Sequence, residues 1–176
     1  MSQNVILVGR IGIENMPIKL IGSAKESLKG LNNALRSKGI KMVNKIVPKD
    51  TGKLRRALIG TFKKSFVDDS GLYFYIGTYR SKIAKYMTIV NENEMGKRLA
   101  HSRYHKRQYS RTNKPGGNAK ILHDPKAEER FLEKISAELY KMMERRVTLI
   151  KIKLIREAEK LNMDMTYMNQ WIYLTR

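Results

Sequence analysis

The chain has 176 residues, a length that fits one domain, and we expect a single domain over residues 1–176. Cysteine is absent, which excludes disulfides and thiolate metal sites. Lysine and arginine number 36 against 16 acidic residues, and the formal charge of +20 predicts an anionic partner or acidic neighbouring subunits. No apolar run approaches the roughly 20 residues of a membrane-spanning helix, and residues 1–10 lack a basic leader, so we expect a soluble protein kept inside a cell.

The first quarter of the chain predicts a strand followed by a helix. Residues 5–8 are apolar and β-branched, which is typical of a buried strand. Apolar residues at helical spacing then predict a helix from Ser23, its expected N-cap, to Val47. Gly39 is the weak point of this helix and marks a candidate bend. Pro48 ends it, because the residue before a proline is pushed out of helical geometry.

The next segment predicts a β-hairpin. Residues 54–67 mix apolar and basic side chains, residues 68–71 are a strong turn signal, and residues 72–77 form an aromatic run typical of a strand. Residues 81–94 place apolar side chains on one side, which predicts a short helix lying on the hairpin.

Residues 97–120 form a long basic loop with eight lysines and arginines, no acidic residue and a Pro-Gly-Gly end. A loop of this length is usually a functional arm or a disordered insertion. It could touch DNA phosphate, reach an acidic patch on an adjacent subunit, or become ordered only on assembly. The candidate contacts are Arg98, Arg103, Lys106, Arg107, Arg111 and Lys114.

The clearest predicted helix starts at Asp124, a good N-cap, with Pro125 at its first position. Its apolar residues step by three or four to Leu161, although residues 150–154 also alternate at period two, so a strand could interrupt it. We place the core at about residues 20–161 and treat 162–176 as a C-terminal extension. Its apolar part, residues 167–174, is expected to dock, with a neighbouring subunit as one candidate.

These elements together predict an α+β fold. We expect a small antiparallel β-sheet packed by an N-terminal helix and a long C-terminal helix, with the long basic loop between them.

One motif bears on function, at the point where the first helix is expected to give way to a strand near Leu54. It reads Pro48-Lys49-Asp50-Thr51-Gly52-Lys53-Leu54-Arg55. Pro48 stops a helix, Asp50 and Thr51 can bond local backbone amides, and Gly52 can adopt a positive φ. The motif resembles the signature of the tailed-phage tail-component family, the head-tail joining and tail-completion proteins.

A second segment is similar to the same family, in which the motif is followed by a hairpin, a tyrosine, Val-x-Glu and a glycine. The matching residues here are Tyr86, Val90, Glu92 and Gly96. The chain departs from the pattern at Met87, where the family has a small residue, and at Gly96-Lys97, where it has Gly-Thr. The resemblance spans roughly residues 23–140.

The resemblance implies a structural virion protein without catalytic activity, cofactor or metal. Such proteins form closed rings, commonly hexamers, between the portal complex and the tail tube around a DNA channel. The implied partners are further copies of the chain, adjacent neck or tail-tube proteins and non-specific DNA, with no membrane; the implied location is the virion, after the host cytoplasm. Arg55 and Arg56 would serve at a subunit interface or be solvated cations on a strand.

The sequence also contains features of two other classes of function. His101, His105 and His123 lie in or beside the basic loop, as in a nuclease of the histidine-metal type, but no carboxylate falls within residues 97–120 to complete a metal site. The stronger alternative is a stand-alone basic nucleic-acid-binding protein, which the charge and the Tyr- and Arg-rich loop favour. No helix-turn-helix, zinc-finger or aromatic RNA-binding signature accompanies that charge.

Overall fold

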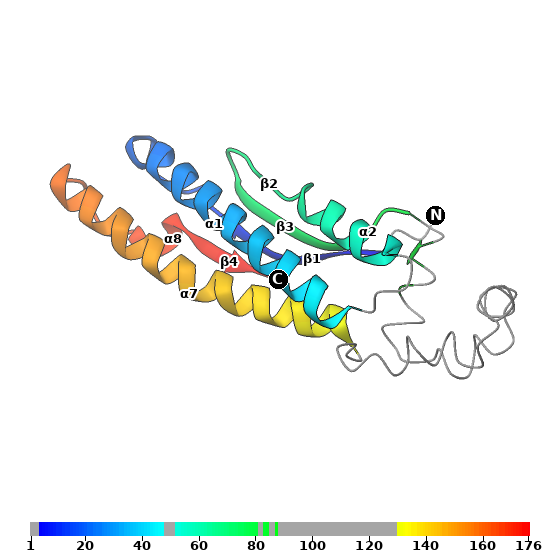
Figure 1. The fold of residues 1–176 in the computed structure, drawn as a ribbon. Coiled ribbons are helices and arrows are strands. Elements are labelled where there is room, and N and C mark those ends of the chain that lie inside the picture. Colours follow the sequence, from blue (N-terminus) through cyan, green and yellow to red (C-terminus); the bar gives the residue numbers. More distant parts are fainter. Residues whose placement is uncertain (1–3, 48–51, 81–82, 85–86, 88–129) are drawn as a thin grey trace, which may run out of the picture.

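The computed structural model describes residues 4–47, 52–80, 83–84, 87 and 130–176 (Figure 1). All four strands pair antiparallel in one sheet with the order β2-β3-β1-β4. The predicted α+β class is therefore confirmed. In chain order the elements are β1 (Asn4–Gly12), α1 (Ile18–Ile46), α2 (Lys53–Phe62), β2 (Phe66–Val67), β3 (Gly71–Thr78), α7 (Phe131–Lys160), α8 (Met168–Trp171) and β4 (Tyr173–Thr175).

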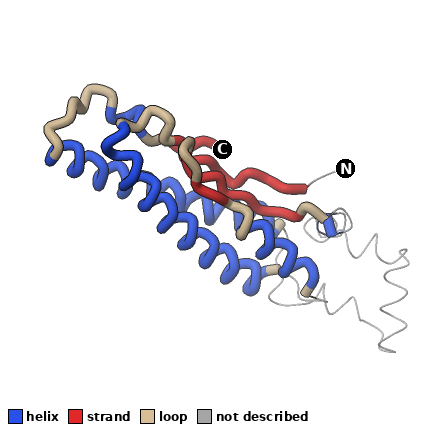
Figure 2. Tube along the Cα trace, turned by 90° about the horizontal axis from the view of Figure 1, so that it is seen from above, coloured by secondary structure: helices blue, strands red, loops and turns tan. Residues whose placement is uncertain are grey.

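The molecule has two layers. Helices α1 and α7 run side by side and lie on one side of the sheet (Figures 1 and 2). Along β3, Leu72, Phe74 and Ile76 are buried, whereas Tyr73 and Tyr75 between them are partly exposed. Because successive side chains of a strand point to opposite faces, the helices cover the apolar face and the tyrosines lie on the other.

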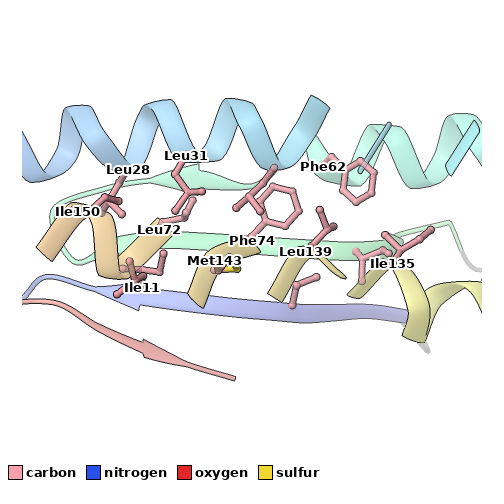
Figure 3. Close-up of a cluster of buried hydrophobic side chains, with 14 of the residues drawn as sticks. Ile11, Leu28, Leu31, Phe62, Leu72, Phe74, Ile135, Leu139, Met143 and Ile150 are labelled. Atoms are coloured by element: carbon pink, nitrogen blue, oxygen red, sulfur yellow. The ribbon is translucent and has the colours of Figure 1, made fainter. Parts of the chain in front are cut away.

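The core lies between these two layers (Figure 3). The two central strands contribute fully buried side chains that include Ile11 and Phe74, and α1 contributes Leu28. Leu139 and Met143 of α7 fill the same space. Burial of each such side chain stabilises the fold by about 1.5–3 kcal/mol relative to exposure.

The long C-terminal helix is confirmed, but its predicted start is wrong. Helix α7 begins at Phe131, since Arg130 has a left-handed φ of 50° that a continuous helix from Asp124 could not contain. The alternative of a strand at residues 150–154 is excluded, because the helix continues without interruption to Lys160. The predicted apolar stripe is buried at Leu132, Ile135, Leu139, Met143, Val147, Ile150, Leu154 and Ala158.

Helix α1 starts earlier than predicted and runs uninterrupted through Gly39. Its N-cap is Pro17 rather than Ser23, and the Leu20 amide donates to the Pro17 carbonyl at 2.8 Å. The additional residues at the start of α1 include Leu20. Its buried side chain continues the apolar stripe of the helix toward β1, which favours a helix there.

The first arm of the predicted hairpin is mostly wrong. Residues 53–62 form helix α2, and only Phe66 and Val67 form a strand. Leu54, Leu58 and Phe62 are four residues apart and all buried, so helical geometry puts them on one apolar face. The turn at residues 68–71 is confirmed, with the Asp68 amide donating to the Gly71 carbonyl at 2.9 Å.

The two remaining predictions concern residues 81–94 and the C-terminal tail. Ile83, Ala84 and Met87 are helical as expected, and the rest of 81–94 lies outside the described residues. The tail docks on its own chain, because Trp171 and Ile172 are buried in the core and β4 pairs with β1. In the described part of the chain, no helix is long and apolar enough to cross a membrane.

Candidate assembly surfaces

The family-like turn motif joins two helices. Gly52 has φ 71° and immediately precedes α2, so the expected positive φ is present. The expected helix-to-strand connection is wrong, since Leu54 and Arg55 lie in the first turn of α2. The other residues of the motif, Pro48, Asp50 and Thr51, lie outside the described residues.

Arg55 ties the start of α2 to the end of α1. Its Nε donates to the Val47 carbonyl at 2.7 Å, and Nη2 donates to the same oxygen. That carbonyl lies just beyond the last turn of α1, where the helix dipole favours a cation. Arg55 is therefore partly buried on a helix, and Arg56 is exposed beside it, so the predicted position of both on a strand is wrong.

Arg36 makes the reciprocal contact and was not singled out in the sequence. From α1, its Nε donates to the Phe62 carbonyl at 3.0 Å, and its Nη2 donates to the Lys63 carbonyl at 3.1 Å and to the Ser65 carbonyl. The guanidinium thus satisfies backbone carbonyls where α2 ends. In the sequence, Arg36 is recognisable only as a cation next to the apolar stripe of α1.

The face of the sheet opposite the helices carries a row of aromatic rings. Phe66 stacks on Tyr73 with ring centroids 5.0 Å apart and on Tyr75 at 6.5 Å, and 44% of Phe66 is exposed. The Arg10 guanidinium lies over Tyr73 at 5.2 Å and over Tyr173 at 5.8 Å. We call this surface, made of Arg10, Phe66, Tyr73, Tyr75 and Tyr173, the sheet face.

Acidic groups border the sheet face. Glu14 pairs with Arg10 and accepts a hydrogen bond from the Tyr173 hydroxyl at 2.7 Å. At the hairpin turn, Asp68 accepts from the Ser70 hydroxyl at 2.7 Å and from the Ser70 amide at 2.9 Å. The Ser70 side-chain bond is the largest cause that lowers the pKa of Asp68, whereas burial raises the pKa of Tyr75.

A second surface lies between α1 and α7, on the side away from the sheet. It is a groove of about 310 Å³. Leu149 on its rim is 55% exposed, and the Lys153 ammonium reaches across to the Ser27 hydroxyl at 3.3 Å. We call this surface the helix groove, and its lining residues are Ser27, Gly30, Leu31, Ala34, Arg146, Leu149, Ile150 and Lys153.

Charge is divided unevenly between the two layers. Helix α1 has seven lysines and arginines against one glutamate, and α7 has eight against five acidic residues. The strands with their adjoining turns, residues 4–14, 63–80 and 172–176, have five cationic and three acidic side chains. The helix layer is therefore more strongly basic than the sheet layer.

The structure leaves the basic-loop predictions open. Arg98, Arg103, Lys106, Arg107, Arg111 and Lys114 lie outside the described residues, as do the three histidines. Among the residues that the structure does describe, no group of three or more His, Asp or Glu side chains is placed to hold a metal ion.

Comparisons with protein-family models, with curated proteins and with solved structures find no match to this chain.

Proposed function

We propose that this chain is a structural virion protein of a tailed phage. It forms a ring in the neck or upper tail, completes the tail and joins it to the head connector around the DNA channel. The proposal assigns no catalytic activity and no cofactor or metal. Its partners are further copies of the chain, adjacent neck or tail-tube proteins and, without sequence specificity, the DNA in the channel.

The observation that carries the proposal is the family-like motif, which follows the amphipathic helix α1 as in the family, although α2 rather than a strand comes after it. Gly52 has the positive φ that the turn requires, Leu54 is buried, and Arg55 bonds to the end of α1. These three residues thus fix the junction between the two helices. The basic helix layer supports a position beside the phosphates of DNA.

The test is negative-stain electron microscopy together with light scattering on the purified chain, at low and high salt and with and without duplex DNA. The proposal predicts closed rings of uniform mass with an axial opening. It also predicts that the rings join a purified head connector or tail tube. A chain that forms no ring, alone or on these complexes, contradicts it.

A second candidate is a stand-alone basic nucleic-acid-binding protein. The seven cations against one glutamate on α1 favour it, because a basic helix face suits phosphate contacts. In the same measurement, this candidate predicts a monomer or dimer that binds duplex tightly. Its affinity should fall steeply with salt, and no ring should form.

A further inference from the structure

The sheet face has the chemistry of a protein-binding surface. Tyrosine, tryptophan and arginine dominate the binding energy of many interfaces, because each combines a large apolar area with a polar group. Here Arg10 lies over Tyr73 and Tyr173, and Phe66 stacks on Tyr73 and Tyr75. The exposed ring of Phe66 lies on the side of the sheet away from α1 and α7. The ring stacking and the pair of Arg10 with Glu14 hold these side chains in place before any partner binds.

The face of the sheet is better suited to association than the edge at β3. Beyond β2, the Tyr75 amide donates to the Ser65 hydroxyl at 3.0 Å. The Thr61 hydroxyl donates to the Gly77 carbonyl at 2.7 Å. These bonds occupy backbone groups that an added strand would need, so growth of the sheet at this edge is blocked.

Charge favours contact between unlike faces of two copies. Two helix layers placed against each other would bring cations together in a chain whose formal charge is +20. The sheet layer has five cationic and three acidic side chains, so its contact with a basic helix layer brings fewer like charges together. At the hairpin turn, Asp69 pairs with Lys25 of α1, and 94% of the Asp69 side chain stays exposed.

The helix groove offers the matching apolar and cationic contacts. A Cβ atom placed at Gly30 would have no other atom within 4 Å, so the floor of the groove is open to an incoming side chain. Leu149 supplies an exposed apolar wall, and Arg146 is an exposed cation beside it. An aromatic ring that enters here gains apolar contact and a cation–π interaction.

We propose that copies of this chain associate head to tail, with the sheet face of one copy docked in the helix groove of the next. The inference rests on the proposed ring and names the surfaces that build it. The sheet face belongs to the sheet layer and the helix groove to the helix layer, and Figure 2 shows these two layers on opposite sides of the molecule. Each copy can therefore use both surfaces at once. A contact between two different patches generates rings when the rotation closes, and rings of more than two copies require it.

The test uses two variants, Phe66→Lys on the sheet face and Leu149→Lys in the helix groove. About half of each side chain is exposed, 44% of Phe66 and 55% of Leu149, so each variant should fold, which circular dichroism checks. Each lysine adds a charge at the proposed contact, and each variant alone should be monomeric by light scattering at concentrations where the wild type is a ring. Mixed in equal amounts, the two variants should form a dimer and stop there. The intact sheet face of Leu149→Lys docks in the intact groove of Phe66→Lys, and the two surfaces left over are the altered ones.

Two exposed apolar residues outside both surfaces provide matched controls. Leu161→Lys lies at the end of α7, and Ile18→Lys lies at the start of α1. Both controls should keep the wild-type mass. The proposal is overturned by a mixture of Phe66→Lys and Leu149→Lys that stays monomeric, or by a ring that both variants still form.

The outcomes separate this inference from the proposed function. If both variants still form rings, the assigned surfaces are refuted, and the proposed function as a ring protein stands. A wild-type chain that stays monomeric up to millimolar concentration refutes the head-to-tail contact. If it also fails to join a purified connector or tail tube, the proposed function fails with it. DNA binding by that monomer supports the nucleic-acid alternative.

Discussion

Replacement of Gly39 by alanine should destabilise the protein, although alanine is the better helix former by about 1 kcal/mol. A Cβ atom at Gly39 would lie 2.8 Å from Cε2 and 2.9 Å from Cζ of Phe62. Carbon atoms in favourable contact are about 3.5–4.0 Å apart, so the ring would have to move. Phe62 is fully buried and stacks on Phe74 at 5.7 Å, which prevents an easy shift.

The magnitude follows from these two opposing terms. Overpacking of a buried site costs about 1–3 kcal/mol, and the gain in helix propensity offsets about 1 kcal/mol of it. We expect Gly39→Ala to lower the free energy of unfolding by about 1 kcal/mol. Gly30→Ala is the matched control, because it lies in the same helix with no atom within 4 Å of the new Cβ. It should raise the free energy of unfolding by about 0.5–1 kcal/mol.

Urea denaturation followed by circular dichroism measures both variants. The midpoints should move in opposite directions, with unchanged slopes and a separation of about 2 kcal/mol between the two free energies. Phe62→Leu in the Gly39→Ala background should cost less than the sum of the single changes, because the smaller side chain relieves the contact. If Gly39→Ala is as stable as Gly30→Ala, the close contact with Phe62 has no energetic consequence and the reasoning fails.

Three further predictions concern polar contacts. Arg36→Met should lower the free energy of unfolding by about 2 kcal/mol, because it leaves carbonyls at the end of α2 without their charged donor; urea denaturation that detects no change would contradict the contact. Arg55→Met should cost about 1–2 kcal/mol through the Val47 carbonyl, whereas exposed Arg56→Met should stay within about 0.5 kcal/mol of wild type in the same assay. Asp68→Ala should cost about 1 kcal/mol at about pH 7, discounted for its exposure to solvent. Because the folded-state pKa of Asp68 is lowered, this stabilisation is present above its ordinary pKa of 3.8 and is lost as the pH falls through the lower folded value. Thermal unfolding should therefore bring variant and wild type together in acid, and an equal gap at about pH 3 would refute the assignment.

Local periodicity predicted the helices better than it predicted their ends. The apolar stripe of α7 has a single strong period, and every predicted position from Leu132 to Ala158 is buried. The start of α7 depends instead on the positive φ of Arg130, a conformation that arginine does not signal. The start of α1 at Ile18 was not predicted because Pro17 and Gly22 are residue types that usually mark a turn.

The prediction of a hairpin arm at residues 54–67 was wrong because the mixture of apolar and basic residues there suits a strand or a helix. Leu54, Leu58 and Phe62 repeat every fourth residue, which is a helical spacing that could have been recognised. The clear turn at residues 68–71 and the aromatic strand after it favoured a hairpin partner of equal length instead. Helix α2 takes that place, and β2 is reduced to Phe66 and Val67.

The candidate surfaces were the least predictable part of the molecule. The turn motif is visible in the sequence, and its Gly52 conformation was anticipated. The sheet face combines residues as distant as Arg10 and Tyr173, and no local pattern indicates that they meet. The helix groove likewise depends on the packing of α1 against α7, so its lining could not be chosen from either helix alone.

The pairing of β4 with β1 also bears on how the protein is made. Arg10 is opposite Thr175 in the sheet, so β1 is translated long before this strand partner. The apolar side of β1 packs against α7, which is also translated long after β1. Contacts of such long sequence separation slow folding. The pairing of β1 with β3 needs only residues 4–78, but the sheet is completed by β4 and covered by α7 only once those later residues have been made. Until then, the nascent chain exposes apolar surface of the kind that chaperones bind.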